Sequence, residues 1–169
     1  TDNTNEIVKS YNDKKISFIH QSRSGSPASP RNHGIRLASG KYIAFCDDDD
    51  IWEPNKLKKQ YTFMENNPDY GACFTKMKRF NEDKEWINPD EQGDTHTNSF
   101  SLLKKNTVPL SSLLVRKDLM NSWFDEDTRI FFAEDYELIL RISKITKMHC
   151  IPEFLIRYCS GNERNTHHY

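Results

Sequence analysis

A short apolar run that ends in four consecutive aspartates is the feature that most constrains the fold of this chain. Residues 42–46 (Tyr-Ile-Ala-Phe-Cys) are rich in aromatic and apolar side chains, which is typical of a buried β-strand. Residues 47–50, all aspartates, follow directly. If residues 42–46 form a strand, the carboxylates project from its carboxyl end, which is where open α/β sheets bind ligands.

Adjacent carboxylates repel one another, so this acidic cluster needs a cation or several hydrogen-bond donors beside it. Carboxylate oxygens are ligands that suit Mg²⁺ or Mn²⁺, especially when the phosphates of a ligand complete the coordination shell. The alternative is a solvated acidic turn that leads into the next helix. The residues alone leave both interpretations open.

Composition limits the class of protein. A length of 169 residues fits one domain, residues 1–169, that can bury a sizeable core. The net charge of -1 gives no electrostatic argument for a nucleic-acid partner. The sequence contains no apolar stretch of the roughly 20 residues that a transmembrane helix needs. Four scattered cysteines without a C-x-x-C pair favour reduced thiols in a cytoplasmic protein.

The pattern of apolar residues and turn signals predicts alternating helices and strands, and therefore an α/β domain. Leu57, Tyr61 and Met64 lie at helical spacing in one expected helix. Another expected helix is strongly amphipathic, with Leu138, Ile142 and Ile145 pointing inward. We expect residues 81–98, which are polar, to form a long loop. The expected helices span residues 6–11, 30–39, 54–66 and 133–145, and the expected strands span residues 16–20, 42–46, 71–80, 113–115, 148–151 and 154–158.

The first residues are unusual for an α/β domain. Residues 1–4 (Thr-Asp-Asn-Thr) can cap a helix, and no strand precedes that helix. We therefore expect the chain to start inside a domain that lacks its first strands. Such a domain would expose apolar surface and unpaired backbone edges, which favours self-association.

Several segments resemble family 2 glycosyltransferases of the GT-A fold. Residues 40–52 (GKYIAFCDDDDIW) resemble the D-x-D segment of that family, with PRNHGI at 30–35 before it and PNKL at 54–57 after it. Residues 132–138 (FAEDYEL) resemble the E-D motif that opens a helix. Residues 1–4 resemble the end of the family's D-G-S-T-D-N-T stretch. The order and spacing of these motifs cover nearly the whole chain.

This resemblance implies a GT-A nucleotide-diphospho-sugar transferase-like fold with a mixed central sheet flanked by helices. It also implies an enzyme that moves a sugar from a nucleotide-sugar donor to an acceptor hydroxyl, with inversion and with the help of Mg²⁺ or Mn²⁺. The expected acceptor is a saccharide or a lipid-linked molecule. The expected location is the cytoplasm or the inner face of the membrane.

The resemblance also assigns roles to four residues near the acidic cluster. Asp47 matches the first position of D-x-D and is expected near the ribose of the donor, with Asp48 beside it in the donor site. Asp49 matches the last position and is expected to bind the metal. Arg31 is expected to bind the donor, because a guanidinium group can hold a phosphate with two hydrogen bonds.

Asp135, in the E-D motif, is the expected general base, because an inverting transfer needs a carboxylate that takes the proton of the acceptor hydroxyl. Acidic residues are also common in the first turn of any helix, so the residues alone allow a purely structural role. Trp52 is suited both to stacking on a sugar and to packing in the core. Two other functions stay open, a nucleotidyltransferase and a non-catalytic nucleotide-sugar or carbohydrate-binding module.

Overall fold

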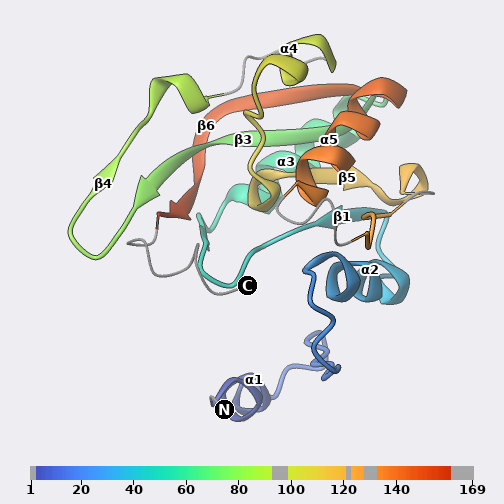
Figure 1. The fold of residues 1–169 in the computed structure, drawn as a ribbon, viewed down its shortest axis with the longest axis vertical. Helices are drawn as coiled ribbons and strands as arrows, with labels where there is room; N and C mark the ends of the chain where they lie inside the picture. The colour runs from blue at the N-terminus through green and yellow to red at the C-terminus, as the bar shows by residue number, and fades with distance from the viewer. Residues whose placement is uncertain (1–2, 93–98, 121–122, 128–132, 161–169) are drawn as a thin grey trace.

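A mixed β-sheet of six strands forms the centre of the protein (Figure 1). The computed structural model describes residues 3–92, 99–120, 123–127 and 133–160. The strands follow the order β1-β5-β3-β6-β2, and β4 pairs with β3 outside this path. The strands are β1 (Tyr42–Ala44), β2 (Ile51–Trp52), β3 (Tyr70–Phe80), β4 (Glu85–Trp86), β5 (Leu114–Arg116) and β6 (Lys147–Cys159).

Helices flank this sheet, which confirms the expected fold class. In Figure 1, α5 lies in front of the sheet and α3 lies behind it, while α2 lies beside β1. The pairs that involve β1, β2, β4 and β5 are antiparallel, and β3 pairs with β6 in parallel, so the sheet is mixed. The helices are α1 (Thr4–Ser10), α2 (Ala28–Leu37), α3 (Lys56–Asn66), α4 (Ser99–Lys104) and α5 (Glu134–Ile145), with short 3₁₀ helices η1 (Pro89–Glu91), η2 (Leu110–Ser112) and η3 (Lys117–Leu119).

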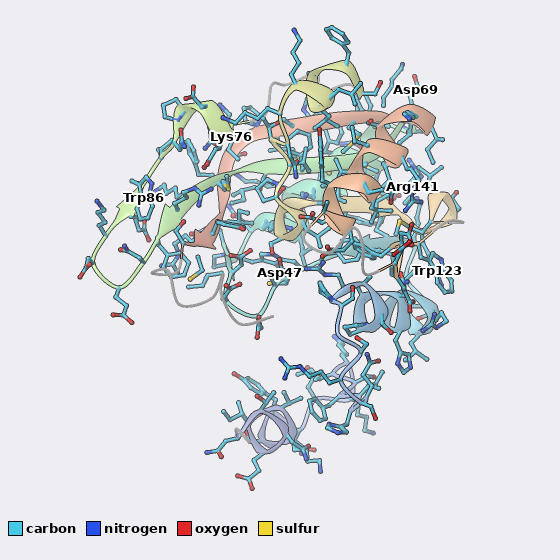
Figure 2. All side chains as sticks on the ribbon, in the orientation of Figure 1. Asp47, Asp69, Lys76, Trp86, Trp123 and Arg141 are labelled. Carbon is cyan, nitrogen blue, oxygen red and sulfur yellow. The ribbon has the colours of Figure 1, made fainter. Side chains whose placement is uncertain are left out.

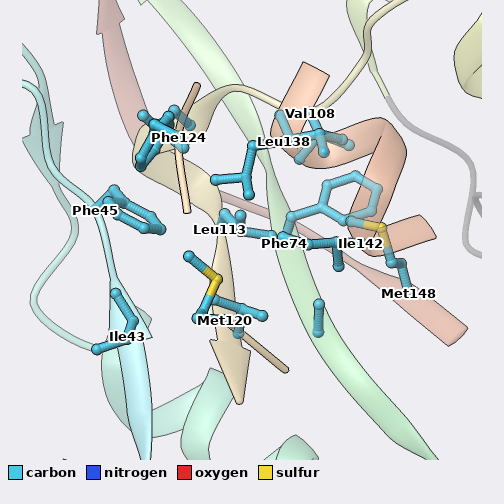
Figure 3. Close-up of a cluster of buried hydrophobic side chains, with 14 of the residues drawn as sticks. Ile43, Phe45, Phe74, Val108, Leu113, Met120, Phe124, Leu138, Ile142 and Met148 are labelled. Carbon is cyan, nitrogen blue, oxygen red and sulfur yellow. The ribbon is translucent and has the colours of Figure 1, made fainter. Parts of the chain in front are cut away.

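The core has one part on each face of the sheet because side chains alternate along the strands. On β3, Phe74 points toward α5 and packs with Leu138 and Ile142, as the close-up in Figure 3 shows. Its neighbour Cys73 points the other way and belongs to a smaller cluster that includes Met64 of α3. The sheet is therefore covered on both faces, and its strand ends are left for function.

The two long central strands, β3 and β6, are joined with an irregular register. Thr75 lies opposite Ile151, but the next residue, Lys76, lies opposite Phe154. The extra residues of β6 include Pro152, which has no N–H group for the ladder and is tolerated at a bulge. We expected two short strands separated at this proline, and the structure has one strand with a bulge.

Several other sequence expectations are wrong. Residues 16–20 form no strand, because no strand of the described sheet lies beside them, and all five residues are exposed. The expected loop at 81–98 contains β4 and η1, while residues 93–98 lie outside the described part. Helix α4 was not expected at all. Ile145 is exposed, whereas Leu138 and Ile142 are buried as expected. Of the three residues at helical spacing in α3, Met64 is buried and Leu57 and Tyr61 are exposed.

The N-terminal part makes little contact with the rest of the protein. None of the seven residues of α1 is buried, and α1 lies apart from the sheet in Figure 1. Ile16, Phe18 and Ile19, which follow it, are 45%, 41% and 44% exposed. Across the described residues, no helix has the length and apolar character that crossing a membrane requires.

Candidate functional site

The four aspartates form a turn that is tied down at both ends. Asp47 lies three residues after the end of β1, near the centre of the molecule in Figure 2. Its backbone N–H donates a hydrogen bond to Ser111 Oγ at 2.9 Å, and the Asp50 N–H donates to the Asp47 carbonyl at 3.1 Å. The buried Asp50 carboxylate accepts a hydrogen bond from the Cys159 N–H at 2.9 Å. Asp48 and the neighbouring Asp49 remain exposed between these anchors.

The electrostatic environment of this acidic turn favours a cation. Partial burial raises the pKa of Asp49, and the negative charges of Asp48 and Asp47 raise it further. Burial also raises the pKa of Asp50, while hydrogen bonds from Ser111 and from the Cys159 N–H lower it. A positive ion beside the exposed carboxylates would relieve the repulsion between them.

The acidic turn supplies hard oxygen ligands, which are the ligands that Mg²⁺ and Mn²⁺ prefer. Within the described residues, no group of three or more His, Cys, Asp and Glu side chains is arranged to hold a metal ion by itself. Magnesium sites that also use substrate phosphates need only one or two protein carboxylates. The exposed Asp49 carboxylate therefore fits a metal that is shared with a ligand, and does not fit a metal held by protein groups alone.

Arg31 joins the two acidic motifs that lie far apart in the sequence. Its Nη2 atom lies 2.8 Å from Asp47 Oδ1, and its Nη1 atom lies 2.9 Å from Glu134 Oε1. The side chain of Arg31 is 20% exposed and that of Glu134 only 6%. Arg31 therefore connects α2, the acidic turn and the start of α5.

Asp135 is the second residue of α5, beside this bridge. Its Oδ1 atom accepts a hydrogen bond from the Tyr136 N–H at 2.6 Å. Burial raises the pKa of Asp135, the Tyr136 hydrogen bond lowers it, the Glu134 charge raises it and the Arg31 charge lowers it. Of these causes burial is the largest, so the pKa of Asp135 is raised overall. A higher pKa makes Asp135 a better proton acceptor.

Asp47 and Asp135 line the same pocket, which has a volume of about 220 Å³. Arg79 and Tyr158 line it as well. Arg79 is held by Glu91, with 2.5 Å between Nε and Oε2, and its guanidinium lies 5.2 Å from the centre of the Tyr158 ring. The pocket therefore offers a carboxylate of raised pKa together with fixed hydrogen-bonding groups.

Three of the residues expected in the site come together, namely Arg31, Asp47 and Asp135. The other two, Asp48 and Asp49, are the exposed residues of the acidic turn that follows Asp47. Trp52 donates a hydrogen bond from Nε1 to the Ser111 carbonyl at 2.8 Å, and Lys56 Nζ lies 4.1 Å from its ring centre. These contacts favour the structural interpretation of Trp52 over stacking on a sugar.

Sequence reasoning missed several residues of the site. Glu134, which binds Arg31, was not expected in the site. Its place in the E-D motif was the only sequence signal that could have pointed to it. Ser111, Arg79 and Tyr158 gave no such signal, because each reaches the site through a fold contact with residues distant in the sequence.

Comparison with known proteins shows that most of the chain matches a single protein family. The family model described as "Glycosyl transferase family 2" matches residues 1–150. A protein of Methanocaldococcus jannaschii named "Uncharacterized glycosyltransferase MJ1057" is 33% identical over 166 residues, which cover 95% of this chain and 57% of that protein.

Two further proteins have names that mention a sugar donor. The Escherichia coli protein "UDP-Glc:alpha-D-GlcNAc-diphosphoundecaprenol beta-1,3-glucosyltransferase WfgD" is 39% identical over 67 residues, or 40% of this chain and 26% of that protein. The crystal structure of S. aureus TarS 1-349 in complex with UDP-GlcNAc matches with a TM-score of 0.72 at 20% identity, and the match covers 96% of this chain and 47% of that chain. This likeness shows the GT-A fold alone, and the chain spans less than two-thirds of each of these proteins.

Proposed function

The chain belongs to glycosyl transferase family 2, and we propose that it transfers a sugar from a nucleotide-sugar donor to an acceptor hydroxyl, with inversion and with metal assistance. The observation that carries this proposal is the pocket that Asp47 and Asp135 share. One carboxylate belongs to the acidic turn on the donor side, and the other has a raised pKa that suits a base. Inversion needs this division of roles, because the base must activate an acceptor hydroxyl that attacks the anomeric carbon of the donor from the side opposite the departing diphosphate.

Asp135 takes the proton of the acceptor hydroxyl in this proposal. Only the ionised carboxylate can act as a base, so activity falls as the pH falls through its pKa. Burial raises that pKa, and the acidic limb of the pH profile therefore lies above the usual range of an aspartate. Asn106 and Tyr158 in the same pocket offer polar groups that can orient the acceptor.

The donor side is formed by the acidic turn. Asp47 and Asp48 bind the donor, and Asp49 would hold Mg²⁺ or Mn²⁺, which when bound neutralises the charge of the departing diphosphate. Both terminal nitrogens of Arg31 donate hydrogen bonds to carboxylates, one to Glu134 and one to Asp47. Its contribution to donor binding is therefore to hold Asp47 in place, and a direct contact with phosphate requires that Arg31 exchange one of these partners.

The names of the related proteins support a choice of donor and acceptor. WfgD is named for UDP-glucose and a lipid-linked diphosphate acceptor, and TarS was crystallised with UDP-GlcNAc. We propose a uridine diphosphate sugar as donor and a saccharide or lipid-linked saccharide as acceptor. We propose that the protein acts in the cytoplasm, and a lipid-linked acceptor would bring it to the inner face of the membrane.

Incubation of the full-length protein with Mn²⁺, a labelled uridine diphosphate sugar and candidate acceptors tests the proposal. A labelled saccharide product and released nucleoside diphosphate are expected, and NMR of the product gives the anomeric configuration. Release of pyrophosphate instead would indicate a nucleotidyltransferase. The longer natural relatives serve as positive controls. If they are active while this protein binds the donor tightly and forms no product with any acceptor, it is a binding module.

A further inference from the structure

A buried polar network lies beneath the acidic turn and is not part of the proposed chemistry. Its members are at most 1% exposed although each carries polar side-chain atoms, and they are Lys56, Gln60, Ser111 and Ser112. Buried polar groups of this kind cost free energy unless each one is hydrogen-bonded. Their hydrogen bonds therefore show what the network is built to hold.

The network fastens η2 to α3 and β2. Lys56 Nζ donates to Gln60 Oε1 at 2.8 Å, and Gln60 Nε2 donates to the Ser112 carbonyl at 2.8 Å. Trp52 Nε1 donates to the Ser111 carbonyl at 2.8 Å, and the Lys56 ammonium lies over the Trp52 ring. The contacts form a closed circuit, so the backbone of residues 111 and 112 is held from two sides.

The Ser111 hydroxyl connects this fixed backbone to the acidic turn. Ser111 Oγ accepts the hydrogen bond from the Asp47 N–H at 2.9 Å. The neighbouring Ser112 hydroxyl is equally buried but donates locally, to the Pro109 carbonyl at 2.7 Å. Two adjacent buried serines therefore have different tasks, and only Ser111 contacts the turn that carries the proposed donor and metal ligands.

We infer that Ser111 is a positioning residue for Asp47 and, through it, for the donor side of the site, and that Trp52, Gln60 and Lys56 hold Ser111 in place. This inference rests on the proposed function only for the identity of the ligand. Loss of the hydroxyl leaves the Asp47 N–H without its acceptor, and the turn that follows then samples other conformations. Donor affinity falls as a result, while Asp135 keeps its place at the start of α5.

The two serines provide a matched pair of variants. Ser111→Ala and Ser112→Ala remove the same atom from neighbouring positions of equal burial. We expect Ser111→Ala to speed amide hydrogen exchange at Asp47 by on the order of tenfold, and to weaken binding of Mn²⁺ with uridine diphosphate by several-fold. In turnover, the KM for the donor rises more than kcat falls. Ser112→Ala leaves the Asp47 exchange rate and the affinity unchanged.

Trp52→Phe gives a second route to the same readouts, because it removes the Nε1 donor to the Ser111 carbonyl and keeps an aromatic ring over Lys56. It should speed exchange at Asp47 in the same direction as Ser111→Ala. Equal effects of Ser111→Ala and Ser112→Ala, or no change at Asp47 in either Ser111→Ala or Trp52→Phe, would overturn the inference. The exchange measurement needs no ligand, so it tests the positioning role separately from the proposed function. A wild-type chain that fails to bind uridine diphosphate would refute the proposed function, and the exchange rates would still decide the positioning role.

Discussion

The carboxylates of the site differ in how firmly the protein holds them, and this difference separates their roles. Asp47 and Asp50 are fixed by hydrogen bonds to groups distant in the sequence. Asp48 and Asp49 are exposed between them. The fixed carboxylates hold the acidic turn in position, and the exposed carboxylates remain available to a ligand or ion. This division leaves Asp48 and Asp49 as the candidates for a metal ligand, and the motif is the reason for proposing Asp49.

Asp49→Asn should abolish the metal-dependent part of donor binding and leave the fold intact, because it removes a charge without a change in size. Calorimetry with Mn²⁺ and uridine diphosphate measures this directly. Asp69→Asn, at another exposed aspartate far from the acidic turn, is the control and should bind as the wild type does. Unchanged affinity in Asp49→Asn would show that the metal lies elsewhere.

Asp135→Asn should lower transfer by on the order of a hundredfold or more, with donor affinity nearly unchanged, because the amide keeps the shape but cannot accept a proton. Single-turnover rates and donor binding are the two measurements. Asp118→Asn, an exposed acid at the start of η3, is the matched control for a change at a helix start. Loss of donor binding together with turnover would move Asp135 from the acceptor side to the donor side.

Lys56 should make the stability of the protein depend on pH in alkaline solution. Burial lowers its pKa from 10.5 to about 8. Below pH 8 the lysine is charged in both states and the penalty for burying the charge is complete. Between about pH 8 and 10.5 the unfolded state binds more protons, so the free energy of unfolding rises with pH, by at most about 3 kcal/mol. The Trp52 ring reduces this value because it favours the charged form.

Chemical denaturation of the wild type and Lys56→Met at pH 7.5 and pH 10 measures this effect as the difference between the two proteins. The wild type should gain stability relative to Lys56→Met at the higher pH. A constant difference across that range would mean that Lys56 is either neutral or normally charged in the folded protein.

At the scale of elements, Arg31 connects α2 to α5 through Glu134 and to the acidic turn through Asp47. Glu134 is almost fully buried, and within the described structure its Oε2 atom has no hydrogen-bond partner. Arg31 is therefore the main group that offsets the cost of burying the Glu134 charge. Arg31→Gln should lower the free energy of unfolding by about 2–4 kcal/mol, because it leaves a buried charge without its partner.

Thermal unfolding should show this loss as a drop in melting temperature on the order of 5–10 °C. Arg36→Gln on the same helix is the control, since Arg36 is exposed and lies over the Trp123 ring instead of a carboxylate. If Arg31→Gln melted like Arg36→Gln, the bridge would contribute nothing to the fold, and Arg31 would be free to serve the donor directly.

Elements with strong local patterns could be predicted from the sequence. The strand before the aspartates follows from its apolar composition. The helix that begins at Glu134 follows from spacing, as do its buried residues Leu138 and Ile142, although Ile145 is exposed. Residues 16–20 have the composition of a strand, but strand formation needs a neighbour, which local sequence does not contain. Pro152 indicated a break, whereas the pairing of β6 with β3 absorbs the proline in a bulge.

The site was predictable where a motif names its residues, and not where the fold supplies them. Asp47 and Asp135 lie in recognisable motifs. Ser111, which holds the first of these, sits in a short 3₁₀ helix whose sequence has no distinctive pattern. Its contact with Asp47 spans 64 residues of chain, and only the sheet order brings the two together.

At the scale of the whole molecule, the exposed apolar segment near the N-terminus should drive self-association. Ile16, Phe18 and Ile19 are each more than 40% exposed and pair with no strand in the described sheet. Exposed apolar side chains on a segment that pairs with no strand are a site for contact with another chain. Sedimentation velocity should show an average sedimentation coefficient that rises with concentration, and replacement of all three residues by serine should reduce this rise.

A control triple variant places serine at exposed apolar positions on the helices, namely Leu57, Tyr61 and Ile145. It should associate as the wild type does. A wild-type chain that sediments as a monomer at every concentration would contradict the prediction.

The hydrogen bond between Asp50 and Cys159 also has a consequence for the newly made protein. The two residues are 109 positions apart, so at roughly 5–20 residues per second a ribosome adds the second about 5–20 s after the first. The Arg31–Glu134 contact is delayed in a similar way, since 103 positions separate its residues. Throughout that interval the nascent chain carries the complete acidic motif without the strand that anchors it. A translation product that stops before β6 would therefore keep the motif and lack the site.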